Sequence, residues 1–124
     1  MKVKGISWLG VGTDRFEETL RFFTDVLGLP VVARGGEVAM LRAGEDQVVE
    51  IFGPGSPTSR LTSPPVPSFE VEDVAAARAE LEGHGVELIG ETGAWNGFEW
   101  QYFRGPDGHV YAVKKTPPPG WETQ

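Results

Sequence analysis

The hydrophobic and polar positions along this chain change period and then repeat the same changes. Residues 3–11 alternate as in a β-strand, and the next segment places Phe16, Leu20, Phe23 and Leu27 at the spacing of one helical face. Strand-like segments follow this helix. The first part of the chain is therefore predicted to form a strand, an amphipathic helix and further strands.

Local signals set the ends of these elements. Thr13 or Asp14 is the expected N-cap of the helix, and Gly28 is expected to end it. Glycine-containing turns at residues 35–36 and 44–46 divide the segment that follows. Strands are expected near residues 30–34, 37–43 and 46–52.

The same order returns after a connector. Residues 53–67 are rich in Pro, Ser and Gly, which is typical of irregular structure. Residues 72–73 then cap a helix with Val74, Ala77 and Leu81 on one face. The second set of elements is a strand at 68–71, that helix, a strand at 86–89, a loop through Trp95, and strands at 98–104 and 109–114. The proline-rich end of the chain is expected to lie outside the core.

One segment occurs in both halves. MLRAGEDQVVEI at 40–51 aligns without a gap with YFRGPDGHVYAV at 102–113, and Glu50 in the first copy corresponds to Ala112 in the second. Two copies of one unit usually exist because neither buries its apolar face alone. The sequence therefore predicts an α+β fold of tandem βαβββ units, which form a curled mixed sheet around a cavity with the helices outside. The expected parts of this single 1–124 domain are unit one at 1–53, a connector at 54–67, unit two at 68–115 and a tail at 116–124.

Composition narrows the possible partners. Asp and Glu total 18 against 11 Lys and Arg, which gives a formal charge of −7. This charge argues against nucleic acid or an anionic membrane as a partner, because both require a clustered basic face. The chain has no cysteine, so disulfides and thiolate chemistry are excluded. No signal peptide or membrane span is recognised, and the cytoplasm is the expected compartment.

Four segments that span most of the chain carry a family resemblance. They are TDRFEETLRFFTDVLGL at 13–29, VEIF at 49–52, SFEVEDVAAARAELEGHGVEL at 68–88 and YFRGPDGHVYAV at 102–113. They resemble the vicinal oxygen chelate superfamily, which contains glyoxalase I, extradiol dioxygenases, fosfomycin-modifying enzymes and bleomycin-binding resistance proteins. Members of such a superfamily share a fold but not a reaction.

The resemblance implies up to four metal ligands in the cavity, usually His or Gln in the first strand and Glu in the last strand of each unit. By strand register these positions are Ile6, Glu50, Val66 and Ala112, and counting back from the first helix replaces Ile6 with Trp8. Four of these five side chains offer no lone pair, whereas a divalent ion requires several oxygen or imidazole donors. The sequence therefore predicts no metal site and no cofactor.

Glu50 is the polar side chain that remains at these positions. It alternates with Val49 and Ile51, which are expected to pack on the helix, so Glu50 is expected to face the cavity. Several roles stay open. Glu50 is a solvated carboxylate or a partner of Arg42 or Arg104, a ligand anchor or acid/base group, or a metal ligand.

The cavity face is also predicted to carry aromatic side chains. The expected ligand-binding residues are Trp8, Met40, Arg42, Glu50, Ser68, Trp100, Tyr102 and Arg104. Ligand sites are mostly apolar with a few placed polar groups, as this set is. Plain core packing is the alternative interpretation of the aromatic residues.

The sequence thus predicts a metal-free small-molecule-binding protein of the glyoxalase/bleomycin-resistance type, with an aromatic or apolar organic ligand in the cavity. The resemblance to the resistance proteins also implies a homodimer. One alternative is a glyoxalase-like lyase or isomerase that uses Glu50 as a catalytic general acid/base, with or without a divalent metal. Another is an interaction or structural module with a closed cavity.

Overall fold

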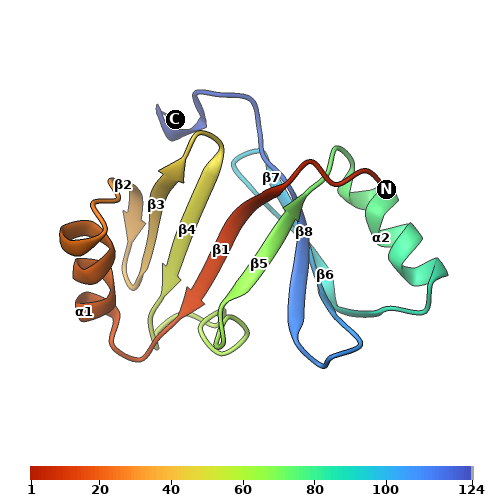
Figure 1. The fold of residues 1–124 in the computed structure, drawn as a ribbon, viewed down its shortest axis with the longest axis horizontal. Coiled ribbons are helices and arrows are strands. Elements are labelled where there is room, and N and C mark those ends of the chain that lie inside the picture. The colour runs from red at the N-terminus through yellow and green to blue at the C-terminus, as the bar shows by residue number, and fades with distance from the viewer. Residues whose placement is uncertain (124) are drawn as a thin grey trace. The chain divides into compact units, whose positions relative to one another are not determined.

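The computed structural model describes residues 1–123, which divide into two compact units (Figure 1). The N-terminal unit runs from Trp8 to Val66. The C-terminal unit combines residues 1–7 with the chain from Pro67 onward. Each unit holds a four-stranded sheet and an α-helix.

The first seven residues group with the C-terminal unit, although the expected boundaries put them in the first. Backbone hydrogen bonds explain this grouping, because Lys4 N donates to Glu70 O (2.9 Å) and Glu70 N donates to Gly5 O (2.8 Å). The opening segment thereby lies along the strand that contains Glu70.

The sheet of the N-terminal unit has the strand order β2-β3-β4-β1. Its strands are β1 (Ile6–Gly12), β2 (Val31–Gly35), β3 (Val38–Gly44) and β4 (Gln47–Phe52). The β1 strand runs parallel to β4, whereas β2-β3 and β3-β4 are antiparallel, so the sheet is mixed. The strands predicted from alternation are confirmed, with ends that differ by a few residues.

The helix α1 (Phe16–Arg21) covers one face of this sheet. It continues as η1 (Phe22–Val26), a π-helical turn, where a regular helix was expected. The N-cap is Arg15 and not Thr13 or Asp14; the Thr13 hydroxyl instead accepts a hydrogen bond from Arg15 N (3.0 Å). The core beneath the helix is apolar and contains Phe16, Leu20, Ala39, Leu41, Val49 and Ile51.

The sheet of the C-terminal unit has the strand order β5-β8-β7-β6. Its strands are β5 (Val66–Glu70), β6 (Glu87–Trp95), β7 (Phe98–Arg104) and β8 (Val110–Lys115). The β5 strand is parallel to β8, and the other pairs are antiparallel. The second sheet thus repeats the pairing scheme of the first.

The helix α2 (Val74–Gly83) covers one face of this second sheet (Figure 1). Its N-cap is Asp73, one of the two residues predicted to cap it, and the Asp73 carboxylate accepts a hydrogen bond from Ala76 N (2.9 Å). The predicted apolar face is also confirmed, because Val74, Ala77 and Leu81 are buried with Val71 and Val113.

Two expectations about this unit are wrong. The segment after residue 89 was predicted to be a loop, but it continues β6 through an irregular register between Ile89 and Gly93. The tail was expected to lie outside the core, but Trp121 is buried at the start of η2 (Trp121–Thr123). Its ring packs edge-on against the Phe98 ring, with 4.8 Å between the ring centroids. This aromatic contact holds the proline-rich segment to the sheet.

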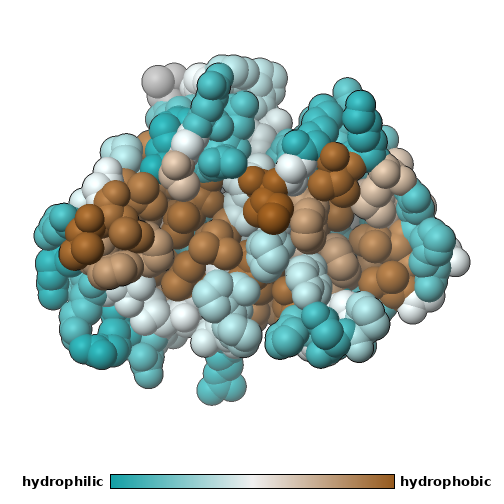
Figure 2. All heavy atoms as spheres, in the orientation of Figure 1, coloured by the Kyte–Doolittle hydropathy of each residue, from teal (hydrophilic) through white to brown (hydrophobic). Residues whose placement is uncertain are grey.

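The α+β class and the tandem units with mixed sheets are therefore confirmed. The cavity remains a prediction. None of the helices within residues 1–123 combines the length and the apolar character needed to cross a membrane. On the surface, apolar side chains gather over the end of α1, η1 and β2 (Figure 2), where Phe22, Val26, Leu27 and Val31 are exposed.

Candidate functional site

The face of the N-terminal sheet opposite α1, called here the first helix-free face, carries Glu50. Its chain neighbours Val49 and Ile51 lie in the core under α1, so alternation turns Glu50 the other way, as predicted. Register adds the adjacent positions, because Glu50 pairs with Met40 on β3 and with Gly10 on β1.

Trp8 holds the carboxylate of Glu50. The indole Nε1 of Trp8 donates a hydrogen bond to Glu50 Oε1 at 2.9 Å. The Trp8 ring lies beside Gly10 of its own strand, where any Cβ would overlap the ring. Glycine at position 10 is therefore what lets the indole reach across to β4.

The surroundings of this pair are mostly apolar. Trp8, Met40, Val48 and Phe52 are buried, and the rings of Trp8 and Phe52 are 6.1 Å apart. Arg42 is half-buried and pairs with Val48 on the same face. The structure thus brings together four of the predicted site residues: Trp8, Met40, Arg42 and Glu50.

The second helix-free face, on the C-terminal sheet opposite α2, carries the other four. Ser68 and Tyr102 both pair with Ala112, which lies between them on β8. Trp100 follows two residues before Tyr102, and Arg104 two residues after it. Ser68 and Ala112 are buried, whereas Trp100 and Tyr102 are half-buried.

Trp100 repeats the arrangement seen at Trp8. Its indole lies against Gly93 of β6, where a Cβ would overlap the ring. Arg104 is placed differently from the others, at the end of β7. Its guanidinium is 3.4 Å from the Glu87 carboxylate and donates a hydrogen bond to Gly108 O (2.8 Å). Arg104 therefore stabilises the β7–β8 turn.

Sequence reasoning missed a polar cluster on this second face. Glu70 accepts hydrogen bonds from the Ser7 hydroxyl (2.6 Å) and from the backbone and hydroxyl of Thr116 (2.8 Å each). Lys114, only 4% exposed, donates to the Thr116 hydroxyl (3.0 Å) and lies 4.8 Å above the Phe98 ring. Strand alternation from Ser68 and Ala112 could have indicated Glu70 and Lys114. The cluster ties the first strand to the tail.

The side chains at the four expected ligand positions cannot hold the metal ion that the family resemblance implies. Of the positions Ile6, Glu50, Val66 and Ala112, only Glu50 offers an oxygen, and Trp8 already donates to it. Within residues 1–123, no group of three or more His, Asp or Glu side chains is arranged to hold a metal ion. What the face can supply is one oriented carboxylate among apolar and aromatic side chains.

The sequence matches the model of a known protein family, and its fold matches solved structures. The family model described as "Glyoxalase/Bleomycin resistance protein/Dioxygenase superfamily" matches residues 5–113. No curated protein sequence matches the chain significantly.

Solved structures share the fold. Methylmalonyl-CoA epimerase from Mycobacterium tuberculosis is 18% identical with a TM-score of 0.74, and the match covers 98% of this chain and 93% of that one. A glyoxalase/bleomycin resistance protein/dioxygenase superfamily member from Vibrio splendidus 12B01 is 16% identical with a TM-score of 0.67, covering 93% and 100%. The Mn(II)-bound glyoxalase from Novosphingobium aromaticivorans is 25% identical with a TM-score of 0.71, covering 92% of this chain but 39% of that one. At these identities the first two matches speak for the fold alone.

Proposed function

Because the chain belongs to the Glyoxalase/Bleomycin resistance protein/Dioxygenase superfamily, we propose that it binds a small aromatic or apolar organic molecule without a metal ion. The observation that carries this proposal is the Trp8–Glu50 hydrogen bond of 2.9 Å on the first helix-free face. A carboxylate fixed in this way is a polar anchor within an apolar surface, which is the usual composition of ligand sites.

The indole sets what the anchor can recognise. The indole N–H of Trp8 donates to one oxygen of the Glu50 carboxylate and so fixes the orientation of this group. An ionised carboxylate accepts hydrogen bonds and cannot donate them. The ligand that suits it is an aromatic molecule with a hydroxyl or N–H donor beside the ring.

The C-terminal unit carries aromatic side chains of its own on the second helix-free face. Trp100 and Tyr102 are half-buried there and lie two residues apart on β7. Aromatic side chains contribute to ligand binding through the area that they bury. Stacking of two rings adds about 0.5–1.5 kcal/mol per pair. Because Trp100 rests on Gly93, its ring is supported from below.

The test is a binding titration with 2-naphthol, a flat ring system with one hydroxyl. We expect 2-naphthol or a related phenol from a screen to quench tryptophan fluorescence and to bind in calorimetry. Glu50→Gln and Trp8→Phe should each weaken binding by about tenfold or more, since a hydrogen bond to a charged group is worth about 1.5–3 kcal/mol. The control is Glu45→Gln, which removes an exposed carboxylate in the β3–β4 turn.

Three results would count against the proposal. They are an aromatic screen without a single binder, binding that Glu50→Gln leaves unchanged, or an equal loss in the Glu45→Gln control. Turnover of a carbonyl compound that Glu50→Gln abolishes while binding persists would instead favour the lyase or isomerase alternative, with Glu50 as the general acid/base.

A further inference from the structure

Gln101 lies between Trp100 and Tyr102 on β7. Its side chain points to the side of the sheet that α2 covers, whereas theirs point to the second helix-free face. Its side chain is 0% exposed. It pairs with Val113, which belongs to the core under α2. A fully buried amide in such a place must find hydrogen-bond partners, because a buried donor or acceptor without a partner is strongly destabilising.

The partners of Gln101 are the irregular residues of β6. Ile89 pairs with Tyr102 and Gly93 pairs with Trp100, so residues 90–92 of β6 stand opposite Gln101 alone. This is a β-bulge, and Gly90 takes a φ of +70° within it. The bulge leaves backbone carbonyls without their usual ladder partners.

The side-chain amide of Gln101 bonds to these carbonyls. Its Nε2 donates to the carbonyls of Ile89 (3.3 Å), Gly90 (3.1 Å) and Tyr102 (2.9 Å). Its Oε1 accepts from the Thr92 hydroxyl (3.1 Å). One side chain therefore bonds to both ends of the bulge.

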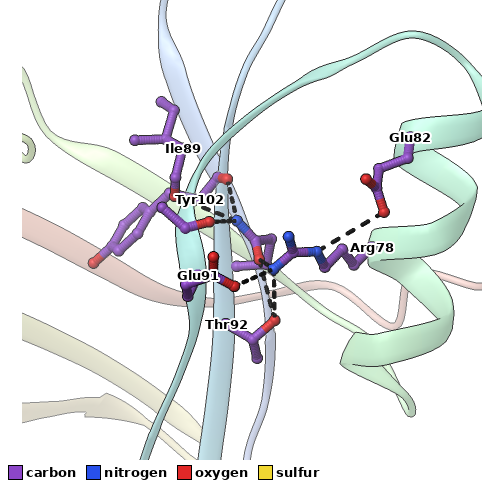
Figure 3. Close-up of polar contacts among 8 residues, drawn as sticks. Arg78, Glu82, Ile89, Glu91, Thr92 and Tyr102 are labelled. Atoms are coloured by element: carbon purple, nitrogen blue, oxygen red, sulfur yellow. Dashed lines mark hydrogen bonds and ion pairs between the residues drawn. The ribbon is translucent and has the colours of Figure 1, made fainter.

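Arg78 connects this amide to α2. Its Nη1 donates to Gln101 Oε1 at 2.9 Å and lies 3.6 Å from the carboxylate of Glu91 (Figure 3). Its Nε is 3.9 Å from Glu82, one helical turn further on. The guanidinium thus fixes the orientation of Gln101, with the oxygen toward the helix and the NH₂ toward the bulge carbonyls.

The bulge decides which residue lies under Trp100. Because three residues of β6 are accommodated opposite one of β7, the ladder resumes with Gly93 beneath the indole. A slip of one residue would bring Thr92 or Ala94 there. Both have a Cβ, and a Cβ at this place overlaps the Trp100 ring.

We propose that Gln101 and Arg78 are positioning residues for ligand recognition, which hold the β6 bulge that places Gly93 under the Trp100 indole. They act from the side of the sheet opposite the ligand and touch no ligand atom. The role in recognition rests on the proposed function, whereas the position of the ring does not. The two parts therefore have separate measurements.

The first measurement is the position of the ring, by NMR in the absence of ligand. In the wild type, ring protons of Trp100 should give nuclear Overhauser contacts to the α protons of Gly93. Gln101→Leu, which keeps the bulk but removes the amide, should abolish these contacts. Arg78→Met should weaken them, and Arg78→Lys, which keeps a donor, should restore them. The matched control is Glu91→Gln, which alters an exposed partner of Arg78 and should leave the contacts intact.

The second measurement is the affinity for 2-naphthol, or for the best phenol from the screen. Gln101→Leu should raise Kd about tenfold, and Gly93→Ala, which displaces the ring directly, should do the same. The double variant with Gln101→Leu and Gly93→Ala should have a Kd no higher than that of the weaker-binding single variant, because both changes act on the same ring. If Gln101→Leu does not fold, the Arg78 pair of variants decides both measurements.

The inference is overturned if the Trp100–Gly93 contacts persist in Gln101→Leu and Arg78→Met, or if the losses of the double variant add in full. If the wild type binds no aromatic compound, the proposed function fails. The ring contacts then still decide whether Gln101 and Arg78 position Trp100.

Discussion

Single residues decide the metal chemistry that is open to this chain. Among the positions where metalloenzymes of the superfamily are expected to hold an ion, Glu50 has a carboxylate and Ile6, Val66 and Ala112 have hydrocarbon side chains. A divalent ion with a single carboxylate and water as ligands is held weakly.

We therefore expect the purified protein to retain no stoichiometric metal. After incubation with Zn²⁺, Mn²⁺ and Ni²⁺ and removal of free ions by gel filtration, elemental analysis should find far less than one ion per chain. One tightly retained ion per chain that Glu50→Gln releases would contradict the metal-free proposal.

The β7–β8 turn contains a carboxylate with a strongly shifted pKa. A hydrogen bond from the Tyr111 hydroxyl (2.6 Å), with further bonds from His109, lowers the pKa of Asp107 from 3.8 to about 2. The same contact raises the pKa of Tyr111. Because the folded-state pKa of Asp107 is lowered, its stabilising contribution is present above about pH 4 and is lost as the pH falls toward 2.

We expect Tyr111→Phe to raise the pKa of Asp107 toward its ordinary value, since the largest cause of the shift is removed. Carbon-detected NMR titration of the Asp107 carboxyl group measures this directly. Tyr102→Phe serves as the control. A wild-type Asp107 that titrates near 3.8, or a Tyr111→Phe variant without change, would show that the contact does not form in solution.

At the scale of elements, the two helices begin in different ways. Asp73 caps α2 with its carboxylate, whereas α1 begins after Arg15 without a side-chain cap. A carboxylate at the N-cap satisfies a backbone N–H and complements the helix dipole. The start of α2 therefore depends on one side chain.

Asp73→Ala should lower the free energy of unfolding by about 1 kcal/mol, the usual cost of losing an N-cap. Asp73→Asn should restore most of it, because the amide oxygen can accept the same bond from Ala76 N. Chemical denaturation of the three proteins measures the difference. The interpretation fails if Asp73→Asn and Asp73→Ala are equally stable.

Element ends and irregularities mark the limit of local signals. No local sequence signal marks the π-helical turn at Phe22–Val26 or the β6 bulge. The bulge exists because Gln101, Thr92 and Arg78 satisfy it from three elements. No periodicity within β6 could have shown this.

At the scale of the whole molecule, the exposed apolar surface at the end of α1 suggests a partner. Phe22, Val26 and Leu27 are 49%, 70% and 51% exposed, and Val31 follows on the edge strand β2 (Figure 2). Contiguous apolar surface next to an edge strand is a common basis for association. We propose that a second copy of this chain covers it, in the homodimer that the family resemblance implies.

The mass of the protein in solution tests this proposal. Light scattering after gel filtration should give twice the chain mass for the wild type, and Val26→Glu should give a monomer because it places a charge in the apolar contact. Val3→Glu is the matched control, since Val3 is 46% exposed and lies outside this patch. A monomeric wild type, or a Val26→Glu dimer, would contradict the proposal.

The sequence by itself determined most of the elements, the tandem units and the faces on which the residues of the regular strands lie. These follow from periods of 2 and 3.6 residues, which are local properties. Alternation placed Glu50 opposite Val49 and Ile51, and the core under α1 agrees. The N-cap at Asp73 was equally readable, because a cap acts over a few residues.

The tertiary structure alone decided which distant groups meet. Trp8 donates to Glu50 from 42 residues away in the chain, and strand register together with the bare backbone of Gly10 allows the contact. The buried ring of Trp121 was equally unreadable, since a proline-rich tail gives no sign of its partner Phe98. Periodicity fixes the side to which a residue points, but contacts between strands depend on packing across the whole fold.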